Sequence, residues 1–134
     1  MSQLPDELQP LKDFHGHLGP FVVIGYLAGV RALEGLRARK YFGISARVEC
    51  EPEPPQSCLA DGVQFAAGCT FGKRNISIHA ASDVAVHFEN TDTGEMLRLT
   101  LRQGLAEQTK AWLDELGDEV AALRTYELGD AVFA

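Results

Sequence analysis

Hydrophobic and polar positions along the 134-residue chain follow a helical period in some segments and an extended period in others. Apolar residues spaced by three or four predict a short helix or a pair of turns over residues 4–14, interrupted by Pro10. From 20 to 39 the pattern predicts a long helix, apolar on nearly every face in its first half and amphipathic in its second. Since a helix that is apolar all round is normally enclosed by protein, we expect the rest of the chain and a second copy to cover it.

The remaining pattern predicts strands and two further helices. Alternating runs indicate strands over 43–50, 76–79, 84–89 and 95–101. Helical spacing indicates a short helix over 58–67 and a longer one over 101–116, each followed by a glycine that ends it, Gly68 and Gly117. Because the last three strands are joined by short polar connections, they favour an antiparallel meander. The last dozen residues fit neither period clearly.

Together these elements predict one α+β domain over residues 1–134. We expect an antiparallel β-sheet packed with a long N-terminal helix and a C-terminal helix. Gly25 and Gly29 lie four residues apart on the long helix, where each glycine costs roughly 1 kcal/mol of helix stability. Close approach of another backbone would offset that cost. The basic run Arg37–Lys40 indicates the C-terminus of the helix, where the dipole favours cations, with a binding patch as the alternative.

Composition narrows the class of protein. A net charge of −7 and a pI near 5.0 argue against a nucleic-acid surface, which requires a basic face. The longest apolar run, residues 18–30, is too short and too interrupted by glycine to span a membrane. Three cysteines are too few for a secreted disulfide framework, and the start lacks a basic, apolar leader. We therefore expect a cytoplasmic protein with neither nucleic acid nor membrane as a partner.

Two histidines lie in a distinctive stretch, Phe14-His15-Gly-His17-Leu-Gly-Pro20. Proline is favoured at the first position of a helix, so the two imidazoles should lie in the turn that leads into the long helix. Residues two apart in extended backbone point to the same side. His15 and His17 would then face one ion near the positive end of the helix dipole.

Two cysteines and an aspartate supply further ligand types for such an ion. Imidazole and thiolate ligands favour zinc or another divalent transition metal, such as iron or nickel. Cys58 and Asp61 share one face of the predicted short helix, and Cys69 follows that helix. No compact Cys-x₂-Cys pair is present, so the alternatives remain open: the histidines act as helix caps or hydrogen-bond a neighbouring carbonyl, and the cysteines are buried core thiols.

Other chemically capable residues have plainer interpretations. Cys50 ends a predicted strand and is expected in the core. His79 and His87 are expected on the exposed side of the sheet. The segment Gly72-Lys73-Arg74-Asn75 is either an anion-binding loop or a solvated turn, and its glycine spacing is not that of a P-loop. A disulfide between Cys58 and Cys69 is disfavoured in a reducing compartment.

Three blocks in order resemble the FmdE family, named after the FmdE component of formylmethanofuran dehydrogenase. They are Phe14-His-Gly-His-Leu-Gly-Pro20, Cys58-Leu-Ala-Asp-Gly-Val-Gln64 and Gly68-Cys-Thr-Phe-Gly-Lys-Arg-Asn75. The resemblance implies an α+β core, an intertwined dimer and an active or metal site. The positions that match that site are His17, Cys58 and Cys69, with Asp61, Gln64 and Lys73 nearby. Because no late cysteine pair is present, the chain resembles members that consist of the core domain without the C-terminal zinc finger.

The leading hypothesis is a homodimeric metal-binding protein of the FmdE type, with a cleft for a small molecule near Gly62 and Gly68. The four proposed ligands are His15, His17, Cys58 and Cys69. No residue is assigned a catalytic role, and the candidates for one are Cys58, Asp61 and Lys73. The alternatives are a non-catalytic binding or assembly component with a structural metal, and a thiol-redox protein that uses Cys58 and Cys69.

Overall fold

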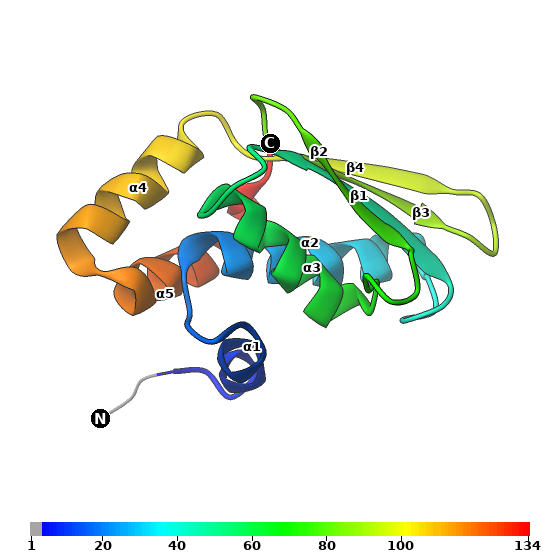
Figure 1. The fold of residues 1–134 in the computed structure, drawn as a ribbon, viewed down its shortest axis with the longest axis horizontal. Coiled ribbons are helices and arrows are strands. Elements are labelled where there is room, and N and C mark those ends of the chain that lie inside the picture. Colours follow the sequence, from blue (N-terminus) through cyan, green and yellow to red (C-terminus); the bar gives the residue numbers. More distant parts are fainter. Residues whose placement is uncertain (1–3) are drawn as a thin grey trace.

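The long apolar helix forms the centre of the fold. In the computed structural model, which describes residues 4–134, helix α2 (Pro20–Leu36) begins at its proline and ends at Arg37, whose backbone is left-handed (φ 50°). Figure 1 shows α2 beside α3 (Leu59–Ala67), with the β-sheet covering both helices. Most of the first half of α2 is buried by elements of the same chain. Intramolecular packing therefore encloses much of the apolar helix, without a second copy.

Five α-helices and two short 3₁₀ helices are present in the described part of the chain. Besides α2 and α3, the helices are α1 (Leu8–His15), α4 (Leu105–Leu116), α5 (Asp118–Leu128), η1 (Gln56–Cys58) and η2 (Gly129–Val132). The predicted N-terminal helix is confirmed as α1, because Pro10 lies in its first turn, where a missing N–H is tolerated. The unassigned C-terminal residues form the end of α5 and η2. None of the helices in residues 4–134 is long and apolar enough to cross a membrane.

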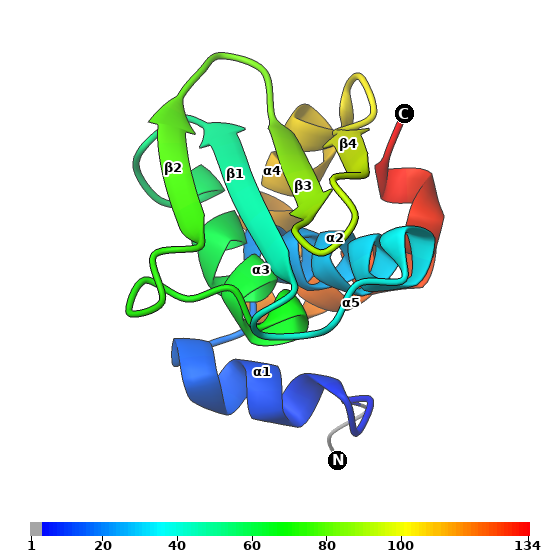
Figure 2. The same ribbon diagram turned by 90° about the vertical axis from the view of Figure 1, so that its right-hand side faces the viewer.

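Four strands form one mixed sheet in the order β2-β1-β3-β4. Their bounds are β1 (Ile44–Cys50), β2 (Ile76–Ala80), β3 (Ala85–Asn90) and β4 (Met96–Thr100). Strand β1 pairs in parallel with β2 and antiparallel with β3, and β3 pairs antiparallel with β4. Figure 2 shows this order across the sheet, with the helices packed behind it.

The antiparallel meander predicted for the last three strands is therefore wrong. Strand β2 does not pair with β3, because β1 lies between them. The reason is the segment that connects β1 to β2, which contains α3 and is long enough to cross over the sheet and place the two strands in parallel. The α+β class and the strand positions are confirmed, whereas the sheet is mixed rather than antiparallel.

Helices α2 and α3 cross with their backbones in close contact. A side chain added at Gly25 would overlap the carbonyl of Leu59, and one at Gly62 would overlap the backbone of Val22. At Gly29, an added Cβ would lie 2.7 Å from the Cβ of Ala66. The prediction that Gly25 and Gly29 allow another backbone to approach is confirmed, and that backbone is α3.

The basic segment after α2 lies outside the helix. Helix α2 has no basic residue in its last turn, so the interpretation of Arg37–Lys40 as the cationic end of a helix is wrong. The left-handed Arg37 turns the chain before the other cations. Arg39 instead forms a two-fold contact with Asp92, its Nε 2.7 Å from Oδ2 and its NH2 group 3.0 Å from Oδ1. This pair fixes the loop that leads into β1 against the β3–β4 turn.

Candidate functional site

The two histidines of the first sequence block lie at the junction of α1 and α2. His15 is the last residue of α1, and Gly16 ends that helix in a left-handed conformation (φ 104°) that favours glycine. The chain then passes through His17 to Pro20, the first residue of α2. The backbone is therefore not extended as predicted, yet the glycine turn brings the two imidazole rings to 4.7 Å between centroids.

Asp61 of α3 fixes the orientation of the His15 ring. Its Oδ2 lies 2.6 Å from Nδ1 of His15, whose side chain is only 9% exposed. An ionised carboxylate can only accept a hydrogen bond, so Nδ1 carries the proton in this contact. The other ring nitrogen, Nε2, is buried and has no hydrogen-bond partner among the described residues. Neutral His15 therefore keeps a lone pair on Nε2 for a ligand or a proton.

A hydrogen-bonded chain continues from Asp61 through α3. The amide of Gln64 donates to Oδ1 of Asp61 at 3.3 Å, and its Oε1 accepts the backbone N–H of Phe71 at 3.0 Å. The second and third sequence blocks are thus joined, because Gln64 belongs to one and Phe71 to the other. This contact holds the carboxylate of Asp61 in position to orient His15.

His17 has a carboxylate partner that the sequence did not reveal. Nδ1 of His17 lies 3.4 Å from Oδ2 of Asp118, the first residue of α5. Both side chains are more than half exposed, so this contact is looser than the one at His15. Asp118 lies 101 positions after His17, and no spacing rule could have joined them. The only local signal was an acidic residue after Gly117, where a helix begins.

Cys58 completes this group at the N-terminal end of α3. It shares a cavity of about 80 Å³ with His15, His17 and Asp118, closed on its apolar side by residues that include Phe21. Burial and the negative charge of Asp61 raise the pKa of the Cys58 thiol. The free protein therefore favours the protonated thiol, and a cation is required to stabilise a thiolate there.

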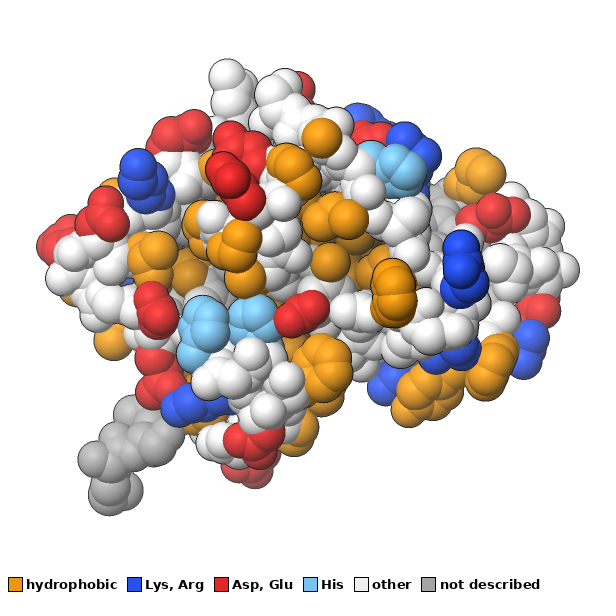
Figure 3. All heavy atoms as spheres, in the orientation of Figure 1, with side chains coloured by type: hydrophobic (Ala, Val, Ile, Leu, Met, Phe, Trp, Pro, Cys, Tyr) orange, Lys and Arg blue, Asp and Glu red, His pale blue; other side chains and the backbone are white. Residues whose placement is uncertain are grey.

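The small cavity adjoins a larger cleft of about 410 Å³ between the start of α2, the loop before η1 and α4. The two spaces are both lined by Pro20, Phe21, Pro55 and Leu113. Charged residues at the larger cleft are mainly acidic: Glu51, Glu107, Lys110 and Asp114. Figure 3 shows histidine side chains at the surface where α1 leads into α2, with hydrophobic side chains above them and acidic side chains on either side.

Cys69 and Lys73 lie apart from this group. Cys58 and Cys69 lie at opposite ends of the nine-residue helix α3, which is about 14 Å long. Cys69 is fully buried, and its Sγ donates to the carbonyl of Ile44 at 3.4 Å. Burial raises the pKa of its thiol to about 11. One ion therefore cannot be bound by both cysteines in this arrangement, and the two thiols are too far apart for a disulfide.

Lys73 instead belongs to a corner formed by two loops. Its Nζ donates to Oγ1 of Thr70 at 2.9 Å and lies 5.9 Å and 5.4 Å from the ring centroids of Tyr41 and Phe42. The side chain of Asn75 accepts the Thr70 N–H and donates to the carbonyl of Tyr41. The segment from Gly72 to Asn75 is thus a turn held by its own hydrogen bonds, away from His15.

The remaining candidates occupy the places predicted for them. Cys50 is fully buried in the core, as predicted. His79 and His87 lie on the outer side of the sheet, half-exposed, where His79 contacts Ser77 and His87 contacts Glu49. Neither is near the cavity at Cys58.

The residues gathered here fit part of a metal site. Within residues 4–134, no three His, Cys, Asp or Glu side chains converge as they stand in a way that could hold a metal ion. The buried, unpartnered Nε2 of His15 nevertheless fits a ligand role, and each histidine has its Nδ1 directed at a carboxylate, the usual partner of a metal-bound imidazole. The four-ligand set that includes Cys69 does not fit.

Comparison with known proteins gives three findings. Residues 14–130 match the profile of the family described as FmdE, molybdenum formylmethanofuran dehydrogenase operon. An FmdE-like protein of tungsten formylmethanofuran dehydrogenase from Syntrophus aciditrophicus has a similar crystal structure, with a TM-score of 0.62 and 25% identity over 96% of this chain and 68% of that one. A probable S-adenosyl-L-methionine-binding protein of Archaeoglobus fulgidus is 40% identical over 81 residues, which are 56% of this chain and 21% of that protein. This chain thus spans about a fifth of the length of that curated relative.

Proposed function

Because this chain belongs to the FmdE family, we propose that it is an FmdE-like protein that binds a divalent transition metal through His15, His17 and Cys58. The observation that carries the proposal is the buried Nε2 of His15, which has no partner among the described residues although Asp61 holds its Nδ1 at 2.6 Å. A buried polar atom without a partner costs about 1–3 kcal/mol. A metal ion would relieve that cost.

The three residues supply ligands of the right kind but need a small adjustment. Two imidazoles and one thiolate are typical ligands of zinc and related ions. The side chain of His17 is 53% exposed and held only by a 3.4 Å contact, so rotation of its ring toward Cys58 meets little resistance. Asp61 and Asp118 would then stabilise the two imidazoles from the side away from the ion.

An ion bound by three protein ligands keeps a position open to the neighbouring cleft. When bound there, a zinc-class ion supplies Lewis-acid chemistry, polarising a carbonyl or lowering the pKa of a water molecule. The protein residues around it exclude bulk water through Phe21, Pro55 and Leu113, and Asp61 keeps the proton of His15 on Nδ1. The cleft of about 410 Å³ is large enough for a small molecule. If the ion is instead closed off by a fourth protein ligand, the structural-metal alternative applies.

A second candidate ligand is suggested by the charge of the cleft. Three of its four charged residues, Glu51, Glu107 and Asp114, are acidic, which favours a cationic ligand. The Archaeoglobus fulgidus relative is described as a probable S-adenosyl-L-methionine-binding protein, and S-adenosyl-L-methionine carries a cationic centre. We therefore include this compound as a test ligand for the cleft.

We also propose that two copies associate through an aromatic corner, defined as Tyr41, Phe42 and Phe71 with Lys40 and Lys73. The three rings are 52%, 72% and 86% exposed, although aromatic residues of this size are usually covered. Aromatic side chains are enriched at the centres of protein interfaces. The lysines of the corner complement a partner of the same sequence, whose net charge is −7.

Cobalt(II) titration tests the metal proposal, because a cobalt–thiolate bond gives its own charge-transfer absorption. Protein purified without a metal-affinity tag and stripped of metal should bind about one ion per chain with that absorption. Cys58→Ala should abolish the band, and Asp61→Asn should weaken binding about 10–100-fold, the usual cost of losing such a partner.

Cys69→Ala is the matched control, since it removes a thiol from the other end of α3. It should retain the band and the stoichiometry. The proposal is rejected if the wild type binds no cobalt or zinc, or if Cys69→Ala rather than Cys58→Ala removes the band. Titration of the same samples with S-adenosyl-L-methionine by calorimetry tests the second candidate, and Asp114→Asn should weaken that binding.

A further inference from the structure

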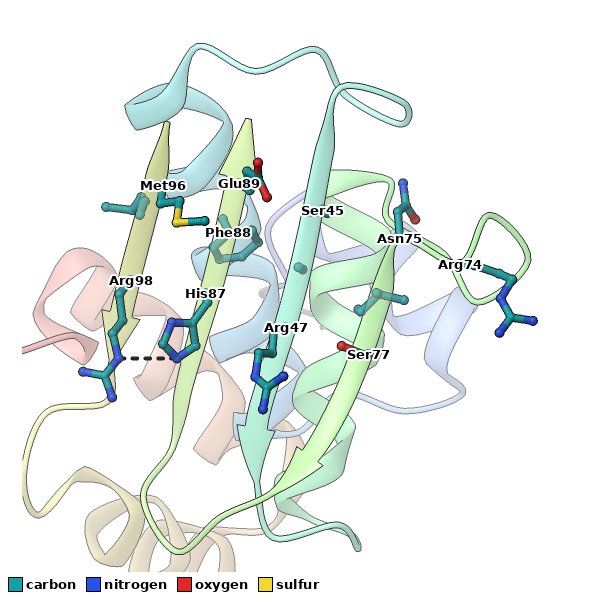
Figure 4. A pocket seen from close by; sticks show the side chains of 13 residues that line it. Ser45, Arg47, Arg74, Asn75, Ser77, His87, Phe88, Glu89, Met96 and Arg98 are labelled. Atoms are coloured by element: carbon teal, nitrogen blue, oxygen red, sulfur yellow. Dashed lines mark hydrogen bonds between the residues drawn. The ribbon is translucent and has the colours of Figure 1, made fainter. Parts of the chain in front are cut away.

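The outer face of the sheet carries a row of polar side chains across all four strands. The register places Ser77 of β2 opposite Arg47 of β1, Arg47 opposite His87 of β3, and His87 opposite Arg98 of β4. We call Ser77, Arg47, His87 and Arg98 the cross-strand row. Figure 4 shows the four side chains at one level of the sheet, with the contact between Arg98 and His87 drawn as a dashed line.

The row places two guanidinium groups on either side of an imidazole. Like charges directly opposite one another on neighbouring strands destabilise a sheet, so this arrangement costs stability whenever His87 is protonated. Glu49 offsets part of the charge, with its Oε2 3.3 Å from Nε of Arg47 and its Oε1 3.2 Å from Nε2 of His87. Arg98 has no carboxylate partner among residues 4–134, and its Nε donates only to Nε2 of His87 at 3.4 Å.

The contacts at His87 cannot all be satisfied at once. One nitrogen, Nε2, faces both a donor, Nε–H of Arg98, and an acceptor, the carboxylate of Glu49. If Nε2 is unprotonated it accepts from Arg98 and repels Glu49. If it carries a proton it donates to Glu49 and leaves Arg98 without an acceptor. An anion beside Arg98 would remove this conflict, because the guanidinium could then donate to the anion.

A cavity large enough for such an anion lies over the row. Its volume is about 610 Å³, and Ser45, Arg74, Glu89 and Met96 lie around the row at its margins. Three arginines therefore face two glutamates, Glu49 and Glu89, so the local charge is positive although the whole chain carries −7. Arginine forks match the planar oxygens of carboxylate and phosphate groups.

We propose that the cross-strand row binds a small molecule through a carboxylate or phosphate group, with Arg98 as its main contact. Arg47 and protonated His87 supply further positive charge, and the hydroxyl of Ser77 can donate a hydrogen bond. The row lies on the sheet face opposite the helices, separate from the cavity at Cys58. This inference does not depend on the proposed metal site.

Nuclear magnetic resonance titration tests the row with inorganic phosphate and with succinate, each at constant ionic strength in a buffer without other oxyanions. We expect saturable shifts of the backbone amides of Arg47, His87 and Arg98. Saturation with phosphate alone assigns the phosphate class, saturation with succinate alone assigns the carboxylate class, and both results support an oxyanion site. The absence of saturable shifts with either probe overturns the proposal.

Variants with opposite expected effects make the test specific. Arg98→Gln should weaken binding about tenfold or more, since a charged hydrogen bond contributes about 1.5–3 kcal/mol. Glu49→Gln should tighten binding, because it removes the carboxylate that competes for the row. The control Arg124→Gln removes the same charge from an exposed position on α5 and should leave the affinity unchanged. Equal weakening by Arg98→Gln and Arg124→Gln would reduce the effect to general charge screening and overturn the assignment.

Discussion

At the scale of single residues, the candidate site depends on which atoms are already occupied. Asp61 takes the proton-bearing Nδ1 of His15, and Asp118 lies beside Nδ1 of His17. Each imidazole then has only Nε2 available for a ligand. Cys58 and Cys69 are separated in the same way by their surroundings, because Cys58 lines a cavity while Cys69 is enclosed in the core.

This difference between the thiols predicts different alkylation rates. The thiolate is the reacting form, and with a pKa of about 11 only about one in a thousand Cys69 thiols is ionised at pH 8. The alkylation rate of Cys69 should therefore rise about tenfold per pH unit between pH 7 and 9.5, and Cys58, which lines a cavity, should react first. Mass spectrometry of peptides after timed iodoacetamide treatment measures both rates.

Urea-unfolded protein is the control for this measurement. There Cys69 should titrate near its ordinary value, so its rate should level off near pH 9. A rate for Cys69 in the folded protein that also levels off near pH 9 would contradict its burial in the core.

At the scale of elements, the crossing of α2 and α3 sets the geometry of the site. Pro20 starts α2 just after the histidines, and Cys58 immediately precedes α3. The glycines at the crossing, Gly25 and Gly62, let the two backbones touch. The distance between the histidine loop and Asp61 therefore depends on residues that have no functional groups.

Gly62→Ala should destabilise the protein strongly, because the added Cβ would overlap backbone atoms of α2. Overpacking of a well-packed core typically costs about 1–3 kcal/mol, and backbone overlap should place this variant at the upper end. Urea denaturation followed by circular dichroism gives the free energy of unfolding.

Gly35→Ala provides the matched control within α2. Gly35 is exposed, and an added Cβ would meet only the end of the Leu97 side chain at 3.5 Å, an ordinary contact. This variant should raise the free energy of unfolding by up to about 1 kcal/mol, the helix propensity difference between glycine and alanine. A loss of stability similar to that of Gly62→Ala would contradict the close crossing as the cause.

At the scale of the whole molecule, the surface is unevenly covered. Helices enclose one face of the sheet, whereas the aromatic corner leaves three large rings exposed where two loops meet. Asn75 holds these loops together through the carbonyl of Tyr41, so the corner is a fixed surface. A fixed, exposed aromatic surface is suited to a partner.

We expect light scattering after size-exclusion chromatography to give twice the 14.6 kDa mass of the chain. Replacing both Phe42 and Phe71 by serine should give the monomer mass, since the apolar centre of the interface would be lost. Met96→Ser removes another exposed apolar residue, 75% exposed on β4, and should leave the dimer intact. Dissociation by Met96→Ser alone would instead assign the interface to the sheet.

The order of residues was enough to locate the local elements and their types. Periods of three to four and of two are written into the order of apolar residues, and they located α1, α2, α3, α4 and the four strands. Pro20 marked the start of α2, and the alternation around Cys50 marked it as a core residue. Short-range geometry also placed the His15 and His17 rings together, since only Gly16 separates them.

Which distant segments meet depended instead on the packing of the folded chain. The crossover through α3 placed β1 between β2 and β3, although a strand–helix–strand order was visible in the sequence as a signal for parallel pairing. Packing of α5 brought Asp118 to His17, and the length of α3 separated Cys69 from Cys58. Local periodicity records which side of an element is buried, but it carries no information about which element buries it. The sequence could therefore name the candidate ligands, whereas the fold decided which of them share one cavity.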